Sequence, residues 1–318
     1  MSVNQVPSTD EQTAIATFLD YADRHIRRYI LSKQKLIKLL EEQKQGIINE
    51  AVTRGLDPNV PMKRSGIEWL GDIPEGWNLK KIKLLVNSRG GMTPSKTEIN
   101  YWNGDIPWVS PKDMKVLELF DSKDHISSLA LQETGITLLP PPVVLIVVRG
   151  MILARTFPVA VTRAPVTVNQ DMKALLPNTQ LDPDFLLFSL LGFKKELLGV
   201  VEESGHGTRC LRTDAWENFT LPIPPPGDQS AIVECLKLKL SKIDKVIADT
   251  YQAISFLREF RTRLIADVVT GKLDVREAAA KLPVEVDELE ALDEDLDEDG
   301  IGLEDELDPD AAPEDDAA

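Results

Sequence analysis

The chain is poor in the residues that build disulfide frameworks and metal centres. It has two cysteines and three histidines among 318 residues. The cysteines, Cys210 and Cys235, stand in unrelated contexts, and the histidines, His25, His125 and His206, are scattered. Disulfide scaffolds and zinc sites need such residues in groups at short, regular spacing. The sequence therefore predicts neither a disulfide-stapled fold nor a bound metal or other cofactor.

Long apolar runs are missing as well. No hydrophobic stretch approaches the 18 residues that a membrane-spanning helix needs, and the N-terminus is too polar for a signal peptide. These absences exclude the membrane classes. Together with the low cysteine content, they predict a reduced, cytoplasmic protein that does not associate with membranes.

Basic residues are absent from the end of the chain. Residues 282–318 contain 18 Asp and Glu and no Lys or Arg, which leaves 36 basic and 34 acidic residues in 1–281. The net charge of -16 therefore belongs to this tail and not to the body of the chain. Because the tail is also almost free of aromatics, we expect residues 282–318 to be disordered.

Sequence motifs of catalysis are also lacking. There is no Asn-Pro-Pro-Tyr/Phe methyltransferase motif, no Gly-x-Gly-x-x-Gly cofactor loop and no Gly-x-x-x-x-Gly-Lys-Ser/Thr phosphate loop. Pro183-Asp184 with Lys194-Lys195 faintly resembles a nuclease metal motif, but these residues fall in a predicted amphipathic helix, where a structural role is the simpler reading. The sequence predicts a chain without catalytic residues.

What the chain does contain is a long segment that occurs twice. Residues 6–57 match residues 223–274 at a constant offset of 217 without a gap. The matched pairs include Pro7/Pro224, Gln12/Gln229, Ile30/Ile247, Ile37/Ile254, Ile48/Ile265 and Leu56/Leu273. A period this long does not indicate a solenoid. It indicates one long helix used twice, with a separate domain between the copies.

Both copies show the spacing of a coiled coil. The first helix is predicted to begin after the capping residues Ser8-Thr9-Asp10-Glu11 and to end near Val52, and the second to run from about Asp228 to Val269. Apolar residues seven positions apart form a seam: Leu19, Ile26, Ile30, Ile37, Leu40 and Ile47 in the first helix, and Leu236, Ile243, Ile247, Ile254, Leu257 and Leu264 in the second. Heptad spacing favours pairing of the helices. The alternative is an amphipathic helix lying on a globular core.

The connection between the helices predicts how they pair. The ends of a domain usually lie close together, so the end of the first helix should lie beside the start of the second. The pair then runs antiparallel, and helices of this length extend about 63 Å. The predicted fold is α/β, with a globular domain flanked by two long helices that form an antiparallel coiled-coil stalk. The predicted parts are residues 1–61 (first helix), 62–226 (globular domain), 227–281 (second helix) and 282–318 (acidic tail).

The central domain mixes strand-like and helix-like patterns. Residues 142–148 predict a buried strand, and residues 159–162 and 164–168 predict partly exposed strands. Residues 182–184, Asp-Pro-Asp, predict the capped start of a helix over 185–198.

Four further stretches in and around the central domain stand out: residues 65–77, 104–114, 204–209 and 221–229. Alone, each reads as ordinary packing or turn structure. In this order, and framed by the repeated helices, they resemble the specificity subunit of type I restriction–modification systems over residues 6–276. Residues 65–77 resemble the entry to that family's target recognition domain, and Asn169-Gln170-Asp171 with residues 205–209 resemble later landmarks. Residues 224–229 and 269–274 resemble the ends of its conserved spacer helix.

The resemblance implies a DNA sequence-recognition subunit that directs methyltransferase and restriction subunits to a target site. The implied partners are double-stranded DNA, modification (methyltransferase) subunits and, through the complex, a restriction/translocase subunit. Typical members carry two target recognition domains and this chain carries one, so we expect a half-size form that pairs with itself or with a second recognition-domain chain. Two alternatives from other classes are an enzyme, either a stand-alone nuclease or a methyltransferase fused to its DNA reader, and a coiled-coil adaptor without a DNA role.

Candidate DNA contacts follow from residue chemistry. Arginine can bind guanine through two hydrogen bonds, glutamine can bind adenine in the same way, and lysine mostly meets phosphate. The candidates in or beside predicted loops are Arg89, Lys96, Lys112, Arg149, Arg163, Gln170, Thr208, Arg209 and Arg212. The acidic tail either solubilises the chain or competes with DNA for such basic groups.

Overall fold

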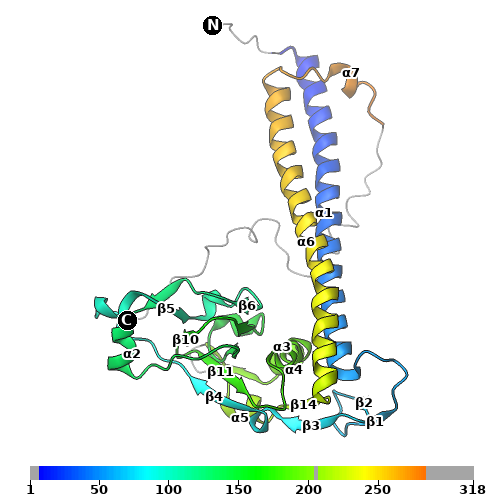
Figure 1. Cartoon of the computed structure of the whole chain (residues 1–318). Helices are drawn as coiled ribbons and strands as arrows, with labels where there is room; N and C mark the ends of the chain where they lie inside the picture. Colours follow the sequence, from blue (N-terminus) through cyan, green and yellow to red (C-terminus); the bar gives the residue numbers. More distant parts are fainter. Residues whose placement is uncertain (1–6, 204–206, 284–318) are drawn as a thin grey trace. The chain divides into compact units, whose positions relative to one another are not determined.

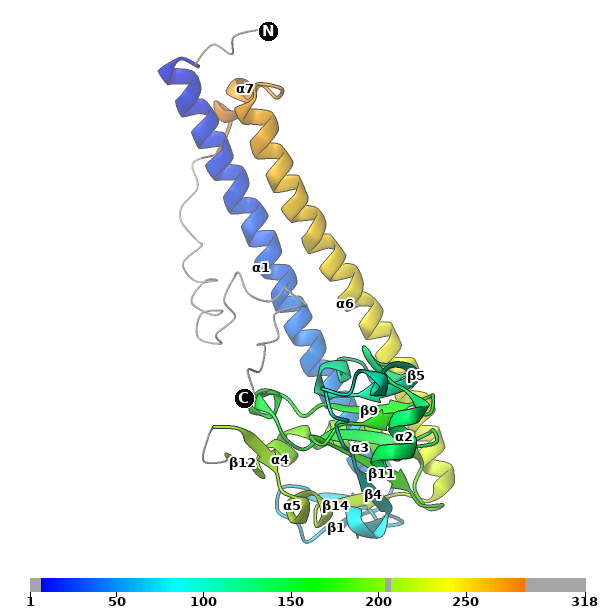
Figure 2. The same ribbon diagram turned by 90° about the vertical axis from the view of Figure 1, so that its left-hand side faces the viewer.

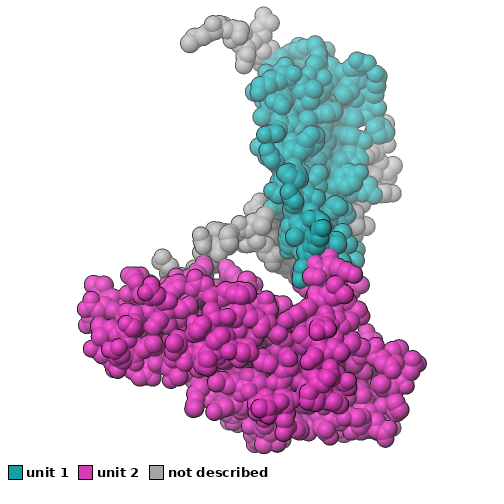
Figure 3. Space-filling model, viewed as in Figure 1, with its two compact units in different colours: residues 1–40, 244–318 teal, residues 41–243 magenta. Residues whose placement is uncertain are grey.

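The computed structural model describes residues 7–203 and 207–283. The acidic segment predicted to be disordered lies outside the described residues, apart from residues 282 and 283. The chain divides into two compact units: residues 1–40 and 244–318 form unit 1, and residues 41–243 form unit 2 (Figure 3). The division falls within both long helices, so each unit contains part of each helix.

The two long helices that the repeat predicts are present. They are α1 (Thr9–Arg54) and α6 (Pro226–Val269), and their first residues are offset by the same 217 positions as the sequence repeat. The predicted cap of α1 is confirmed. The Ser8 backbone N–H donates to Glu11 Oε2 at 2.9 Å, and the Glu11 N–H donates to Ser8 Oγ at 3.4 Å. At the other end of α1, Gly55 takes a positive φ of 79°, a conformation that favours glycine after a helix.

In unit 1 the two helices run side by side in opposite directions (Figures 1 and 2). Asp23 of α1 pairs with Arg261 of α6, and Glu11 pairs with Arg276 at 2.7 Å. One residue number rises as the other falls, which defines the antiparallel sense. Arg276 begins the short helix α7 (Arg276–Ala279), and its hydrogen bonds to Asp274 lower the pKa of that carboxyl to about 2.

Besides the end of α1 and the start of α6, unit 2 contains the short strands and helices that lie between the two long helices in the sequence (Figures 1 and 2). Its strands are β1 (Met62–Arg64), β2 (Asp72–Pro74), β3 (Asn78–Lys81), β4 (Val86–Gly90), β5 (Trp102–Val109), β6 (Glu118–Leu119), β7 (Asp124–Ile126), β8 (Val144–Val147), β9 (Val159–Thr162), β10 (Thr167–Val168), β11 (Met172–Pro177), β12 (Val201–Glu203), β13 (Arg209–Leu211) and β14 (Thr220–Ile223). Its helices are α2 (Ser128–Thr134), α3 (Pro183–Gly192), α4 (Lys194–Leu198) and α5 (Thr213–Glu217), with 3₁₀ turns η1 (Ile82–Leu84), η2 (Ile99–Tyr101), η3 (Pro111–Asp113) and η4 (Met151–Ala154).

These strands form several sheets in a mixed α/β unit. The five-stranded sheet has the order β4-β11-β8-β9-β6, and the three-stranded sheet has the order β10-β5-β7. The remaining pairs are β1-β2, β12-β13 and β14-β3. The predicted buried strand over 142–148 is confirmed as β8, whose four residues are all buried.

The sequence pattern predicts partly exposed strands over 159–162 and 164–168. The first prediction is wrong in its exposure, because β9 is buried throughout. The second segment is partly exposed, at Ala164 and Pro165, but its strand, β10, begins only at Thr167. Since β9 lies between β8 and β6 and packs against α3, its threonine and alanine positions are covered as well as its valines. The buried Thr162 hydroxyl accepts a hydrogen bond from the Val143 N–H at 3.1 Å, which satisfies it.

The predicted amphipathic helix over 185–198 is also wrong in part. Its capping residue is confirmed, because the Asp182 carboxylate accepts the backbone N–H groups of Asp184 and Phe185. However, the segment forms two helices that meet at Phe193, and α3 is buried on nearly all sides. One side lies against the sheet, and the other meets α1 so closely that a Cβ on Gly192 would lie 2.6 Å from the Val52 side chain. Such a helix has no exposed face to make it amphipathic.

Aromatic side chains pack together where the chain passes from α1 to the first strands of unit 2. Trp77 is buried and lies within 3.2 Å of the Cβ position of Gly55, at the end of α1. Trp69 stacks on Phe219 at a centroid distance of 5.2 Å and meets Phe193 edge-on at 5.3 Å. The tryptophans of residues 65–77 therefore pack against neighbouring elements, as ordinary packing residues do. No helix among the described residues is long and apolar enough to cross a membrane.

Candidate nucleic-acid interface

Several loops of unit 2 meet at one end of the five-stranded sheet. Both β4 and β8 are antiparallel to β11, with Gly90 opposite Lys173 and Val147 opposite Met172. The chain therefore leaves β4 and β8 at the same end at which it enters β11. We call this end the loop edge, and it comprises residues 90–96, 149–150, 169–171 and 208–211.

The turn over residues 169–171 is the hub of the loop edge. The Asp171 carbonyl accepts the backbone N–H groups of Val148 at 2.8 Å and Arg149 at 3.2 Å. The Asn169 side chain is almost fully buried and accepts the Asp171 N–H at 3.1 Å, while the Asn169 N–H donates to the Val109 carbonyl at 2.9 Å. The turn is thus tied to the ends of both β8 and β5, which fixes its position.

The loop over residues 90–96 lies directly against this turn. A Cβ on Gly91 would lie 2.0 Å from the Val168 carbonyl oxygen, so no larger residue fits without a backbone shift. The next residue, Met92, donates its N–H to the same carbonyl at 3.0 Å. A glycine is therefore required for this close approach of two backbones.

The ribbon of β12 and β13 brings a fourth segment to the loop edge. Arg149 and Cys210 form an isolated β-bridge, and the Gly150 N–H donates to the Arg209 carbonyl at 3.0 Å. Gly150 has a φ of 132°, which allows the chain to turn away from β8 at this point. Arg149 and Arg209 consequently come from distant parts of the sequence to adjacent positions.

Most of the residues predicted to contact DNA lie at or next to the loop edge. They are Arg89, Lys96, Arg149, Gln170, Thr208, Arg209 and Arg212. Two of them form ion pairs with carboxylates: Arg209 pairs with Glu203 at 2.9 Å, and Arg212 pairs with Asp214 at 3.0 Å. Residues 204–206 of the glycine-rich stretch lie outside the described residues.

Lys112 lies beside the loop edge. It is part of η3, which directly follows the end of β5, and Val109 of β5 is hydrogen-bonded to Asn169. A capping box between Ser110 and Asp113 fixes this turn. The Lys112 ammonium pairs with Asp124 at 2.5 Å, so the charge is partly neutralised within the protein.

Arg163 is not brought to the loop edge. It follows β9, whose end lies beside the start of β8, at the opposite end of the sheet. Its guanidinium contacts Glu118 and also Asp184 at 2.5 Å, and Lys237 of α6 reaches Asp184 at 2.9 Å. Burial alone would lower the pKa of Arg163, but the hydrogen bonds to both carboxylates outweigh it and the pKa is raised. The structure gives Arg163 the role of joining the sheet, α3 and α6.

Two cations at or next to the loop edge are not among the contacts predicted from the sequence. Lys173 of β11 lies across Gly90, with its ammonium 3.0 Å from the Cβ position of that glycine, and the exposed Arg155 follows η4. The sequence does not predict either as a DNA contact, because its candidates lie in or beside loops, although Lys173 interrupts an otherwise apolar strand. Within the described ranges, five cations of this region form no ion pair: Arg89, Lys96, Arg149, Arg155 and Lys173.

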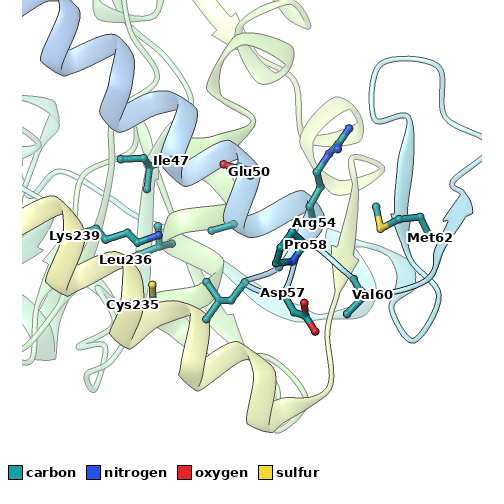
Figure 4. Close-up of a pocket in the computed structure, with 13 residues that line it drawn as sticks. Ile47, Glu50, Arg54, Asp57, Pro58, Val60, Met62, Cys235, Leu236 and Lys239 are labelled. Atoms are coloured by element: carbon teal, nitrogen blue, oxygen red, sulfur yellow. The ribbon is translucent and has the colours of Figure 1, made fainter.

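The surface at the loop edge suits an anionic, hydrogen-bonding ligand. Unpaired guanidinium and ammonium groups attract phosphates, and exposed amide groups can donate and accept hydrogen bonds at base edges. A pocket of about 330 Å³ lies elsewhere in unit 2, between the end of α1, the connection to β1 and the start of α6 (Figure 4). None of the candidate DNA contacts lines it. Among the described residues, no three His, Cys, Asp or Glu side chains gather to hold a metal ion.

Comparison with known proteins gives consistent matches. A family model described as "Type I restriction modification DNA specificity domain" matches residues 74–252. The type I restriction enzyme EcoR124I/EcoR124II specificity subunit of Escherichia coli is 32% identical over 57% of this chain and 42% of that protein. The MjaIX specificity subunit of Methanocaldococcus jannaschii is 30% identical over 52% of this chain and 38% of that protein. The chain thus spans less than half the length of either relative.

Solved structures show the same fold. A chain from a structure described as "Structural basis underlying complex assembly and conformational transition of the type I R-M system" superposes with a TM-score of 0.65 at 18% identity. It covers 84% of this chain and 61% of that chain. The HsdS subunit from Thermoanaerobacter tengcongensis superposes with a TM-score of 0.51 at 19% identity, covering 84% and 60%. At these identities the likeness concerns the fold, a mixed α/β domain with long helices.

Proposed function

Because the chain belongs to the family of type I restriction modification DNA specificity domains, we propose that it is the DNA sequence-recognition subunit of such a restriction–modification complex. The observation that carries the proposal is the loop edge, where distant segments bring unpaired cations and an exposed glutamine together. We propose that the loop edge contacts double-stranded DNA. The chain acts in the cytoplasm, where it supplies recognition and no catalytic step, and it takes no cofactor. The domain boundaries are those that the sequence predicts: residues 1–61, 62–226, 227–281 and 282–318.

The DNA-binding part of the proposal predicts a measurable salt dependence. Each phosphate contact that is lost should lower the slope of log affinity against log salt by about 0.9. We expect Arg149→Ala to lower the slope by about one and to weaken binding to all duplexes alike. Lys195→Ala, which removes an exposed cation from α4, should leave the slope unchanged. Titration of the full chain with duplex DNA between about 50 and 200 mM salt makes the comparison. Equal slopes for both variants would contradict the proposal that the loop edge contacts DNA.

We further propose that α1 and α6 in unit 1 pair as an antiparallel coiled coil. The opposite direction of the two helices and the burial of Ile30, Ile37, Ile247 and Ile254 support it. The remaining seam positions are buried or half-buried: Leu19, Ile26, Leu40, Leu257 and Leu264 in unit 1, and Ile47, Leu236 and Ile243 in unit 2. A continuous apolar seam at seven-residue spacing is what such pairing needs.

The outer faces of these helices support docking of modification subunits. Tyr29 and Leu39 of α1 are exposed apolar residues, and so are their repeat equivalents Val246 and Phe256 of α6. Exposed apolar side chains that recur at matching positions indicate surfaces that a partner covers. Two equivalent surfaces suit two copies of the same partner, and through them the restriction subunit joins the complex.

The end of α6 supports docking of a second recognition domain. In unit 2, Val52 and Ile48 of α1 pack against α3 and are 0% and 5% exposed. Their repeat equivalents in α6, Val269 and Ile265, are 63% and 40% exposed. The same helix surface that carries the recognition domain in unit 2 is thus open in unit 1. We propose that a recognition domain of a second copy, or of another chain, occupies it.

This arrangement predicts an assembly that depends on Val269. Light scattering at micromolar concentration, with the modification subunit present, should show two recognition domains in each complex. Val269→Glu places a charge on the exposed surface and should reduce the complex to one recognition domain. Arg149→Ala, which removes a proposed DNA contact, should assemble normally. A single recognition domain in the wild-type complex, together with an asymmetric methylated site, would contradict the proposal.

A further inference from the structure

Two polar side chains from opposite sides of the loop edge are hydrogen-bonded to each other. The Thr93 hydroxyl donates to the side-chain oxygen of Gln170, which joins the loop over 90–96 to the turn over 169–171. Gln170 is exposed, and Thr93 is half-buried beside it. The contact spans 77 residues of sequence, so both the sheet and the loop must be in place for it to form.

Gln170 keeps hydrogen-bonding capacity after this contact. A glutamine amide has two acceptor lone pairs and two N–H donors. Thr93 uses one lone pair, and the weak bond from Gln170 Nε2 to Asp171 Oδ2, at 3.4 Å, uses one N–H. One acceptor and one donor remain on an exposed side chain. This combination matches the edge that adenine shows in the major groove, with its N6 amino donor and N7 acceptor.

Two tryptophans hold the threonine side of the pair. Trp108 is buried and donates its indole N–H to the Met92 carbonyl at 2.9 Å. Trp102 donates its indole N–H to the Ser95 carbonyl at 3.1 Å. The two rings pack edge-to-face at 5.2 Å, so they brace one another. Thr93 lies between the two carbonyls that are held in this way, and its position is fixed although it belongs to a loop.

The turn beneath Gln170 is fixed as well. Asn169 and Asp171, which flank it, are tied to each other and to the ends of β5 and β8, as described above. An exposed glutamine on a free loop would lose side-chain entropy on binding a base, whereas one already held in place loses less. A site that reads a base must be held in this way by the residues around it.

We propose that Gln170, oriented by Thr93, reads an adenine in the major groove of the target site. Trp108 acts as a positioning residue that holds Thr93 in register through Met92. The inference rests on the proposed function, since it requires the loop edge to face DNA. The unpaired cations Arg89, Arg149 and Lys173 lie at the same edge, where they can contact the phosphates on either side of the base that is read.

Selection from a randomised duplex library tests this inference. The full chain, alone and in complex with its modification subunit, is used to enrich bound duplexes, which are sequenced and compared among variants. We expect the wild-type motif to contain an A·T pair whose preference disappears in Gln170→Ala, while all other positions are retained. A good two-bond contact discriminates by about 5- to 150-fold, so the loss is readily measured. Thr93→Val, which removes only the hydroxyl, should weaken the preference at that same position.

The exchange Gln170→Glu makes the test sharper. Glutamate keeps the length of the side chain but can only accept, and cytosine N4 is the base donor that a carboxylate suits. The preferred base at that one position should therefore change from adenine to cytosine. Trp108→Phe keeps an aromatic ring, although a smaller one, but loses the indole N–H. It should broaden the preference at the same position without changing binding to non-specific DNA. Gln132→Ala, an exposed glutamine of α2, is the matched control and should leave the motif intact.

The outcomes separate the inference from the function on which it rests. A wild-type chain that enriches no motif, alone or in complex, overturns both. A clear wild-type motif that survives unchanged in Gln170→Ala and Gln170→Glu overturns the inference and leaves the proposed function intact. Loss of preference at a position that is not A·T also overturns it. Thermal unfolding of each variant shows whether it is folded, and a variant that keeps most of its motif is by that fact still a DNA reader.

Discussion

Replacing Ile37 and Ile247 together by alanine is expected to lower the free energy of unfolding of unit 1 by about 4–8 kcal/mol. Each side chain is buried, and a buried isoleucine truncated to alanine costs about 2–4 kcal/mol. The ion pair between Asp23 and Arg261 sets the register of the antiparallel helices. Fourteen residues, or two heptads, lead from Asp23 forward to Ile37 and from Arg261 back to Ile247, which places these two isoleucines at the same level of the antiparallel pair. The two truncations therefore remove both sides of one layer of the seam. Most of the helix pair in unit 1 should then lose its ordered packing.

The matched control uses exposed apolar residues of the same helix. Tyr29→Ala with Leu39→Ala removes comparable apolar volume, but both side chains face solvent and should cost less than about 1 kcal/mol together. Denaturant unfolding followed by helical circular dichroism measures both double variants. The two exposed variants should instead weaken binding of the modification subunit. Equal stability of the two double variants would contradict the coiled coil proposed for unit 1.

The sequence predicts the long helices well because the signal occurs twice. Capping residues, heptad spacing and a constant offset all point to the same two elements, and helix periodicity is a local property. The structure extends α1 by two residues, to Arg54, and starts α6 at Pro226, which differs little from the prediction. The family resemblance is likewise confirmed by the family model, because it rests on motifs spread over most of the chain.

The central domain is predicted less completely, because its burial depends on non-local packing. The pattern of residues 159–162 contains alanine and threonine and indicates an exposed face, yet neighbouring strands and α3 cover it. In the same way, Leu190 and Leu191 continue a helical pattern that stops at Phe193. Propensity and period describe one segment at a time, and tertiary contacts override them when both faces of that segment are covered.

The prediction of the candidate DNA contacts is incomplete for the same reason, because it depends on non-local structure. Residue chemistry selects cations and amides in loops, but it does not show which loops share one end of a sheet. Arg163 and Arg149 look alike in sequence, yet one is held by two carboxylates and the other has no ion pair among the described residues. Lys173 is not among the predicted contacts because it lies in a strand, β11, which is next to the edge of its sheet. Successive side chains of a strand point to opposite faces, so a strand residue can also reach the surface.

Gln229→Ala is expected to destabilise unit 2 by about 2–4 kcal/mol, whereas its repeat equivalent Gln12→Ala should cost less than about 0.5 kcal/mol. Gln229 is 1% exposed, accepts the Asp182 N–H at 2.8 Å, and donates to the carbonyls of Gln180 at 2.9 Å and Pro224 at 3.0 Å. Its removal leaves the buried Pro224 carbonyl and the part-buried Asp182 N–H and Gln180 carbonyl without this partner. An unsatisfied buried group costs about 1–3 kcal/mol before water or relaxation compensates, and a part-buried one costs less.

Gln12 offers a matched control because its side chain makes the corresponding local bond and no other hydrogen bond among the described residues. Its amide donates to the Pro7 carbonyl at 2.9 Å, as Gln229 does to Pro224, but it is exposed and solvent can replace the bond. Denaturant unfolding followed by tryptophan fluorescence reports on unit 2, and similar costs for both variants would contradict the prediction. In a complex with two recognition domains, the surface around Gln12 would be covered as that around Gln229 is. Gln12→Ala should then weaken this assembly at least 10-fold while leaving the isolated chain stable, because the glutamine gains its buried partners only when the second domain binds.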